Sequence, residues 1–148
     1  MGSTQSAITQ SVSLDVSQQA AWRCLTEPEY VSRWLGCMQF EKRVGHVFYM
    51  QQDPQKRAGN DPSGATHCEI LTLEAPSVFS FSWYLPGTPA TTVSFRLRST
   101  EAGTDLAFSH DGWHQFDEEE IRPVREALAQ GWQSFVLPGL KELAESQA

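Results

Sequence analysis

The C-terminal segment from Val124 to Leu143 constrains the fold of this chain more than any other part. Its apolar side chains recur at spacings of three and four residues, the period of one face of an α-helix. That face consists of Val124, Leu128, Trp132, Phe135, Gly139 and Leu143. The pattern predicts a long helix with Pro123 in its first turn. Pro138 lacks an amide hydrogen and predicts a kink near residues 134–139.

Much of the remaining chain alternates between apolar and polar residues with the period of two that is typical of β-strands. The expected strands are residues 8–16, 37–42, 45–51, 66–74, 78–84, 91–99 and 104–111. Two short helices should follow the first strand. Ser17 would cap one that ends at Leu25, and a capping box from Thr26 to Glu29 would start another that ends near Trp34. Residues 52–64 read as a long loop.

This order of elements predicts an α+β helix-grip fold. A curved antiparallel sheet of seven strands would wrap around the long C-terminal helix, because no other element is long enough to cover the concave face. A chain of 148 residues can bury one core without disulfides or a structural metal. We therefore expect a single domain over residues 1–148, with residues 1–6 flexible.

Charge and cysteine content exclude several classes of function. The formal net charge of −7 argues against nucleic-acid binding, and the acidic run 117–120 is better interpreted as the start of a helix. The three cysteines form no metal-ligand spacing and an odd number makes a poor disulfide framework, so a reducing cytoplasm is expected. The sequence contains neither a secretory signal nor an apolar run that could span or insert into a membrane.

Several short motifs occur in a characteristic order along nearly the whole chain. They are Ala21–Glu29, Trp34–Gly36, Phe81–Trp83, Thr92–Leu97, Gly103–Leu106, Ser109–Trp113 and Gly131–Trp132. In this order the chain resembles the START-like (SRPBCC) superfamily, and within it the single-domain relatives of the heat-shock-protein-90 ATPase activator (AHSA-like). The resemblance implies a cavity for hydrophobic or aromatic ligands, including lipid- or polyketide-like molecules, and no universal catalytic residue.

The cavity would lie between the sheet and the C-terminal helix. We predict that its ligand-binding residues are Trp34, Phe48, Phe81, Trp83, Phe95, Phe108, His110, Trp132 and Phe135. Alternation places His110 on the same strand face as Phe108. There it could orient a ligand or act as a general base, although a hydrogen-bonded core histidine is the stronger interpretation.

The primary hypothesis is therefore a binder of a small hydrophobic or aromatic molecule, with no catalytic residue and no cofactor. An enzyme of the cyclase or hydrolase type, with His110 as acid and base, is the alternative. A co-chaperone-like module with a chaperone partner is a further one, although the eukaryotic activator has an additional N-terminal domain that this sequence lacks. A metal site at His110 and His114 is disfavoured, because their spacing suits a helix rather than extended chain. A monomer or a homodimer is expected.

Overall fold

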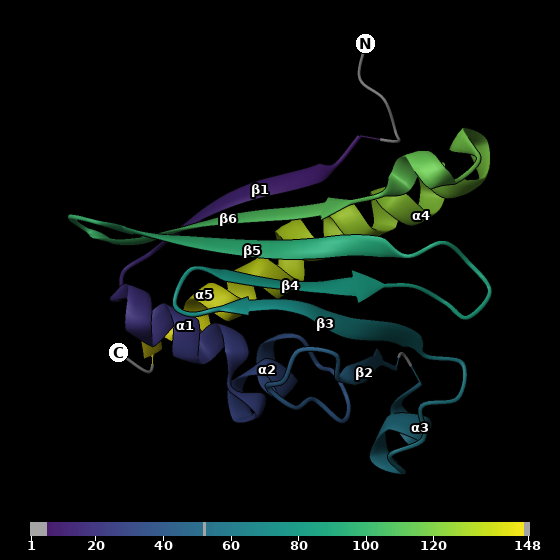
Figure 1. Ribbon diagram of the computed structural model, residues 1–148, viewed down its shortest axis with the longest axis horizontal. Helices are drawn as coiled ribbons and strands as arrows, with labels where there is room; N and C mark the ends of the chain where they lie inside the picture. Colours follow the sequence, from purple (N-terminus) through teal and green to yellow (C-terminus); the bar gives the residue numbers. More distant parts are fainter. Residues whose placement is uncertain (1–5, 52, 147–148) are drawn as a thin grey trace.

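The computed structural model describes residues 6–51 and 53–146. Of residues 1–6, for which flexibility is expected, residues 1–5 lie outside the described part. Within that part, six strands form one antiparallel sheet in the order β1-β6-β5-β4-β3-β2. The strands are β1 (Ile8–Leu14), β2 (Val47–Met50), β3 (Thr66–Glu74), β4 (Val78–Trp83), β5 (Thr91–Thr100) and β6 (Gly103–Asp111). The sheet and the long C-terminal helical segment that crosses it confirm the helix-grip fold (Figure 1).

The sheet has six strands instead of the expected seven, because residues 37–42 do not form a strand. Met38 makes a single bridge to Tyr49, in which each amide donates to the other residue's carbonyl at 2.8 and 3.1 Å. The next residue, Gln39, has a φ of +61°. This left-handed conformation is incompatible with extended pairing, so the predicted hairpin is wrong. The expected loop after β2 contains a short helix, α3 (Pro54–Ala58), capped by Asp53.

Two helices, α1 (Gln18–Thr26) and α2 (Pro28–Trp34), lie where the sequence predicts them. Ser17 caps α1 as expected, since its side chain accepts a hydrogen bond from the Ala20 amide at 3.1 Å. The predicted capping box of α2 is wrong. The Thr26 hydroxyl donates instead to the Trp22 carbonyl inside α1, and Glu27 begins α2 without a side-chain cap.

The C-terminal segment consists of α4 (Glu118–Gly131), a π-helical turn labelled η2 (Trp132–Val136) and α5 (Leu137–Ser146). Asp117 caps α4, which confirms that the acidic run starts a helix. Pro123 lies inside α4 rather than in its first turn. The predicted irregularity near Pro138 takes the form of the π-turn, in which the Leu137 amide donates to the Trp132 carbonyl five residues earlier.

Helices α4 and α5 cover one face of the sheet (Figure 1). They also contact the chain at both ends of the edge strand β1. The Arg125 guanidinium donates to the carbonyls of Ser6 and Ala7, just before β1. At the other end of the strand, Lys141 donates to the Ser13 carbonyl at 2.7 Å, and the Asp15 amide donates to Glu145 at 2.9 Å. These contacts occupy backbone groups at both ends of an otherwise open strand.

Candidate ligand-binding site

Eight of the nine predicted site residues form one connected cluster of rings beneath the helices. Trp34 and Phe108 each contact Phe95, with ring centroids 5.5 and 5.3 Å apart, and Phe108 lies 4.7 Å from Trp132. The cluster continues through Phe48, Phe81, Trp83 and His110. All of them are buried except Trp83, which is half-buried. These side chains therefore pack against one another as core.

Phe135 is the predicted site residue that lies outside this cluster. Its side chain is 73% exposed, whereas Leu137 is buried. The cause is the π-turn, which places one extra residue between Trp132 and the next buried position and so rotates Phe135 outward. Conversely, Phe40 and Phe79 belong to the core cluster although the sequence pattern did not single them out as site residues.

His110 is held by hydrogen bonds at both ring nitrogens. The Thr91 hydroxyl donates its proton to the Trp83 carbonyl at 2.8 Å, so it must accept from His110 Nε2, which lies 2.7 Å away. The Trp132 indole nitrogen, which can only donate, lies 3.2 Å from His110 Nδ1. This network assigns a neutral imidazole with its proton on Nε2. The Trp113 indole donates to the His110 carbonyl at 2.9 Å.

The environment of His110 opposes protonation. Burial, followed by the positive charge of Arg125, lowers the pKa of His110 from 6.5 to about 3. A general base needs a free lone pair and a pKa near the working pH, whereas the Nδ1 lone pair here accepts a hydrogen bond from the Trp132 indole N–H. The geometry thus favours the core-histidine interpretation.

A groove of about 520 Å³ opens at the end of the sheet, between α4, the 3-10 turn η1 (Trp113–Gln115) and the loop that joins β4 to β5. We call it the α4 groove. Its lining residues are Thr66, Trp83, Tyr84, Leu85, Thr88, Pro89, Thr91, Trp113, Phe116, Ile121, Val124, Ala127 and Leu128. Among the described residues, none that line it is charged.

Local structure holds the walls of the α4 groove in place. Gly112 has a φ of +109°, and a Cβ at this position would lie 3.1 Å from the Thr91 Cα, so glycine allows η1 to approach β5 closely. The side-chain amide of Gln115 donates to the Ala90 carbonyl at 2.8 Å, which ties η1 to the β4–β5 loop. Within that loop, the Thr88 hydroxyl donates to the Leu85 carbonyl at 2.7 Å.

Only Trp83 belongs to both the predicted site and the α4 groove. The sequence pattern predicts a cavity under the middle of the helix, where the structure shows that the rings fill the space. Leu85 and Pro89 lie between the expected strands 78–84 and 91–99, in a segment for which the sequence predicts no regular element. The signal that could have found the groove is the apolar spacing of Ile121, Val124 and Leu128 at the start of α4.

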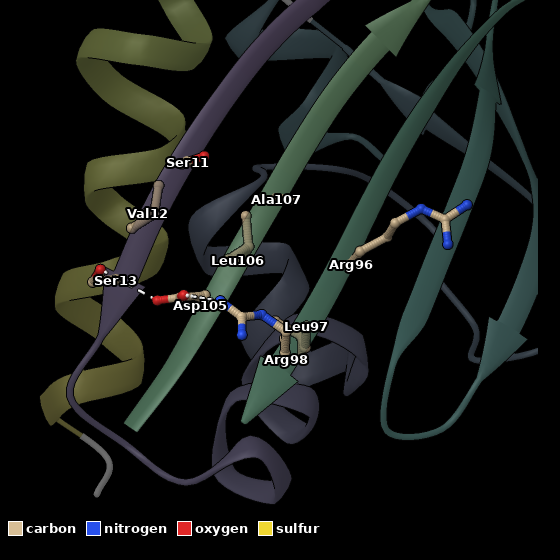
Figure 2. Close-up of a pocket in the computed structure, with 9 residues that line it drawn as sticks. All are labelled: Ser11, Val12, Ser13, Arg96, Leu97, Arg98, Asp105, Leu106 and Ala107. Atoms are coloured by element: carbon tan, nitrogen blue, oxygen red, sulfur yellow. Dashed lines mark hydrogen bonds and ion pairs between the residues drawn. The ribbon is translucent and has the colours of Figure 1, made fainter. Parts of the chain in front are cut away.

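A second hollow, of about 410 Å³, lies on the outer face of the sheet over β1, β6 and β5. Figure 2 shows Ser13, Asp105 and Arg98 joined across its floor, and Arg96 directed away from them. Arg96 and Arg98 are exposed because they alternate along β5 with the buried Phe95 and Leu97. The Asp105 carboxylate accepts a hydrogen bond from Arg98 at 2.8 Å, so these two charged side chains of the hollow already pair with each other.

Other candidate chemistry is not assembled in the described part of the chain. Cys24, Cys37 and Cys68 are buried and free. Burial raises the pKa of Cys24 to about 11 and that of Cys37 to about 12, as expected of small core residues rather than nucleophiles. Within residues 6–51 and 53–146, no three side chains of His, Cys, Asp or Glu gather in a possible metal site. No helix in these ranges is long and apolar enough to cross a membrane.

An open antiparallel sheet, a long C-terminal helical segment against it and an apolar groove at one end together define a helix-grip protein. The family profile described as "Activator of Hsp90 ATPase homolog 1-like protein" matches residues 15–145, so the chain belongs to this family. This confirms the resemblance seen in the sequence. Among curated proteins, no sequence matches the chain significantly.

Solved structures share the fold. Protein MLL2253 from Mesorhizobium loti is 24% identical, with a TM-score of 0.78 over 96% of this chain and 98% of that chain. The solution structure of the Aha1 dimer from Colwellia psychrerythraea has a TM-score of 0.69 at 18% identity, with 94% and 96% covered. DynU16, a putative protein in the dynemicin biosynthetic locus, has a TM-score of 0.73 at 19% identity. The match covers 96% of this chain but 48% of DynU16.

Proposed function

We propose that the protein binds a small, neutral, apolar molecule in the α4 groove. The observation that carries this proposal is an apolar groove of about 520 Å³ whose described lining residues include no charged side chain. Ligand pockets typically enclose roughly 300–1,000 Å³ and combine apolar walls with a few polar groups. The groove fits this description, whereas the rings under the middle of the helix are in mutual contact.

The polar groups of the groove indicate how a ligand would be oriented. The Trp113 ring is buried and its indole nitrogen is committed to the His110 carbonyl, so Trp113 forms a fixed wall of the groove. The half-buried rings of Trp83, Tyr84 and Phe116 also line the groove and can stack against a flat ligand. The Trp83 indole nitrogen has no hydrogen-bond partner in residues 6–51 and 53–146, so it can donate to a ligand carbonyl or hydroxyl. These features favour a flat aromatic or polyketide-like molecule with one acceptor over a simple lipid chain.

Replacing one of two matched alanines by phenylalanine can test the proposal, because Ala127 lines the α4 groove and Ala107 lines the outer hollow. Both side chains are exposed, so a larger residue should leave the fold intact. Native mass spectrometry and tryptophan quenching against a panel of aromatic metabolites, polyketides and fatty acids would first identify a ligand. Ala127→Phe should then weaken binding by about tenfold or more, and Ala107→Phe should leave it unchanged.

Each outcome of this experiment is informative. Equal affinity of the two variants would place the ligand elsewhere, and loss of binding in Ala107→Phe alone would move the site to the outer face of the sheet. A panel in which no ligand of any class shifts the signal would count against a binding function. A ligand that emerges chemically changed, with turnover that disappears in His110→Gln, would support the enzyme alternative instead.

Two further expectations remain part of the proposal. Activation of a chaperone ATPase is supported by the description of the family alone, and measuring the ATPase rate of a purified heat-shock-protein-90 with and without this protein tests it. An unchanged rate would remove this alternative.

A cytoplasmic location is supported by the three free, buried cysteines, which suit a reducing compartment.

A further inference from the structure

Phe135 lies at the edge of a third hollow, where the C-terminal helical segment passes α2. This hollow has a volume of about 370 Å³ and lies between α2 and α5. We call it the Phe135 face. Its lining residues are Arg33, Trp34, Phe135, Gly139, Glu142, Leu143 and Ser146. At 73%, Phe135 has the highest exposure among the exposed large apolar side chains of the described residues.

The exposure of Phe135 is fixed by the backbone. The π-turn rotates the side chain outward while Trp132 and Leu137 stay buried. Returning Phe135 to the core would require the helix on one side of the π-turn to rotate about its axis. A large aromatic side chain held in water in this way forgoes the favourable free energy of burial until another molecule covers it.

Gly139 provides a depression one turn beyond Phe135. A Cβ at this position would meet nothing within 4 Å, so the fold of the monomer does not require glycine here. Glycine inside a helix nevertheless stabilises the helix less than alanine does. The missing side chain instead allows a ring from outside to approach the backbone of α5 closely.

Two opposite charges flank the same hollow. Arg33 lies at the end of α2 and Glu142 lies in α5, and neither has an ion-pair partner within residues 6–51 and 53–146. An isologous contact requires a surface that is complementary to itself under a two-fold rotation. The Phe135 face offers the components of such a contact: an exposed ring beside a glycine, and a cation beside an anion.

We propose that a second copy of this chain docks on the Phe135 face to form a two-fold symmetric dimer. Phe135 of each subunit would pack over Gly139 of the other, and Arg33 of each would pair with Glu142 of the other. Burial of the two rings would provide most of the affinity, and the two ion pairs would fix the register. This inference goes beyond ligand binding and does not depend on it, because the face shares no lining residue with the α4 groove.

Sedimentation equilibrium and light scattering of the full chain test the dimer. The wild-type protein should show a monomer–dimer equilibrium, and Phe135→Ser should raise the dissociation constant by about tenfold or more. Val44→Ser, which changes another exposed apolar side chain at 56% exposure, should leave it unchanged. Because both positions are exposed, circular dichroism should show an unaltered fold. A monomeric wild-type protein, or a dimer that Phe135→Ser does not weaken, overturns the proposal.

Charge reversal tests the symmetry of the contact. Arg33→Glu alone and Glu142→Arg alone should each weaken self-association, since every subunit then places like charges opposite each other. An equimolar mixture of the two variants should form a heterodimer in which both pairs attract, with affinity restored toward that of the wild type. The double variant Arg33→Glu/Glu142→Arg should also dimerise. If the mixture stays monomeric while the wild type dimerises, the proposed two-fold register is wrong.

Discussion

At the scale of single residues, His110 shows how a polar side chain can be a fully satisfied part of an aromatic core. A single line of hydrogen bonds leads from Trp132 through the imidazole and Thr91 to the Trp83 carbonyl. Each donor in this line has one acceptor. Adding a proton to Nδ1 would turn its acceptor into a donor facing the Trp132 N–H, so the network and burial both favour the neutral ring.

This arrangement predicts how stability depends on pH. The pKa of His110 is about 3 in the folded protein against 6.5 for an ordinary histidine, so the unfolded chain takes up the proton first as the pH falls. The stabilising contribution is complete above pH 6.5 and is lost progressively below it. Between pH 7 and pH 5 this group should lower the free energy of unfolding by about 2 kcal/mol.

Urea denaturation at the two pH values measures this effect, with His110→Gln as the control for all other titrating groups. A glutamine amide can still donate and accept in place of the ring but cannot titrate. The wild-type protein should therefore lose about 2 kcal/mol more than the variant between pH 7 and pH 5. Equal losses would show that His110 is already accessible to protons in the fold.

Alternation along β6 was sufficient to place His110 and Phe108 on the inner face of the sheet. It could not distinguish a cavity wall from a packed core, because that depends on side chains that arrive from other elements. Phe40, for example, comes from a segment without regular strand structure, and its ring lies 5.0 Å from that of Phe48. The identities of the rings were therefore predictable, but the space between them was not.

At the scale of elements, the π-turn between α4 and α5 determines which side of the C-terminal helix is buried. A constant period of 3.6 residues places Phe135 on the same face as Trp132, as the sequence pattern predicts. The wider turn makes Leu137 the next buried residue instead. Pro138 favours such an irregularity, since it cannot donate to the Ser134 carbonyl and its ring would crowd that group in a regular helix.

A π-turn is equivalent to one residue inserted into an α-helix, so removing that residue should be tolerated. Deletion of the exposed Ser134 should leave Trp132 and Leu137 one α-helical turn apart and both buried. Deletion of the exposed Glu126 from regular α4 should instead rotate the first half of the helix out of register. Thermal unfolding should show a smaller loss of melting temperature for the Ser134 deletion, and the opposite order would contradict this account of the turn.

The elements themselves were largely predictable, and the exceptions have local causes. Strands β3 to β6 lie within one residue of their expected bounds, because alternation and turn residues agree there. The segment 37–42 also alternates, but the left-handed Gln39 interrupts it. Asparagine and glycine signal that conformation in a sequence, whereas glutamine does not.

At the scale of the whole molecule, the charged side chains lie outside the described lining of the α4 groove. The chain carries a formal net charge of −7, yet no charged residue is among the described residues that line the groove. An anionic ligand would be repelled by the molecule as a whole and would find no cationic partner among the described lining residues of the groove. This separation favours a neutral ligand held by apolar burial.

Calorimetry at two salt concentrations and several temperatures can check this. A neutral ligand should bind with a negative heat-capacity change, and its affinity should change less than about twofold with salt, because screening acts only on charges. A carboxylate analogue of the same ligand should bind more weakly at low salt and recover partly at high salt. A neutral ligand whose affinity falls steeply with salt would indicate charged contacts outside the described groove.

The contacts that α4 and α5 make with the β1 edge link the size of the ligand groove to the protein's resistance to aggregation. Open strand edges are templates for aggregation, and here Arg125, Lys141 and Glu145 occupy backbone groups at both ends of the strand. Arg125 belongs to the same helix as the groove residues Ile121 and Leu128. Enlarging the groove by lifting α4 would therefore also uncover the edge, so variants selected for bulkier ligands should do best when they shorten wall side chains and leave the helix in place.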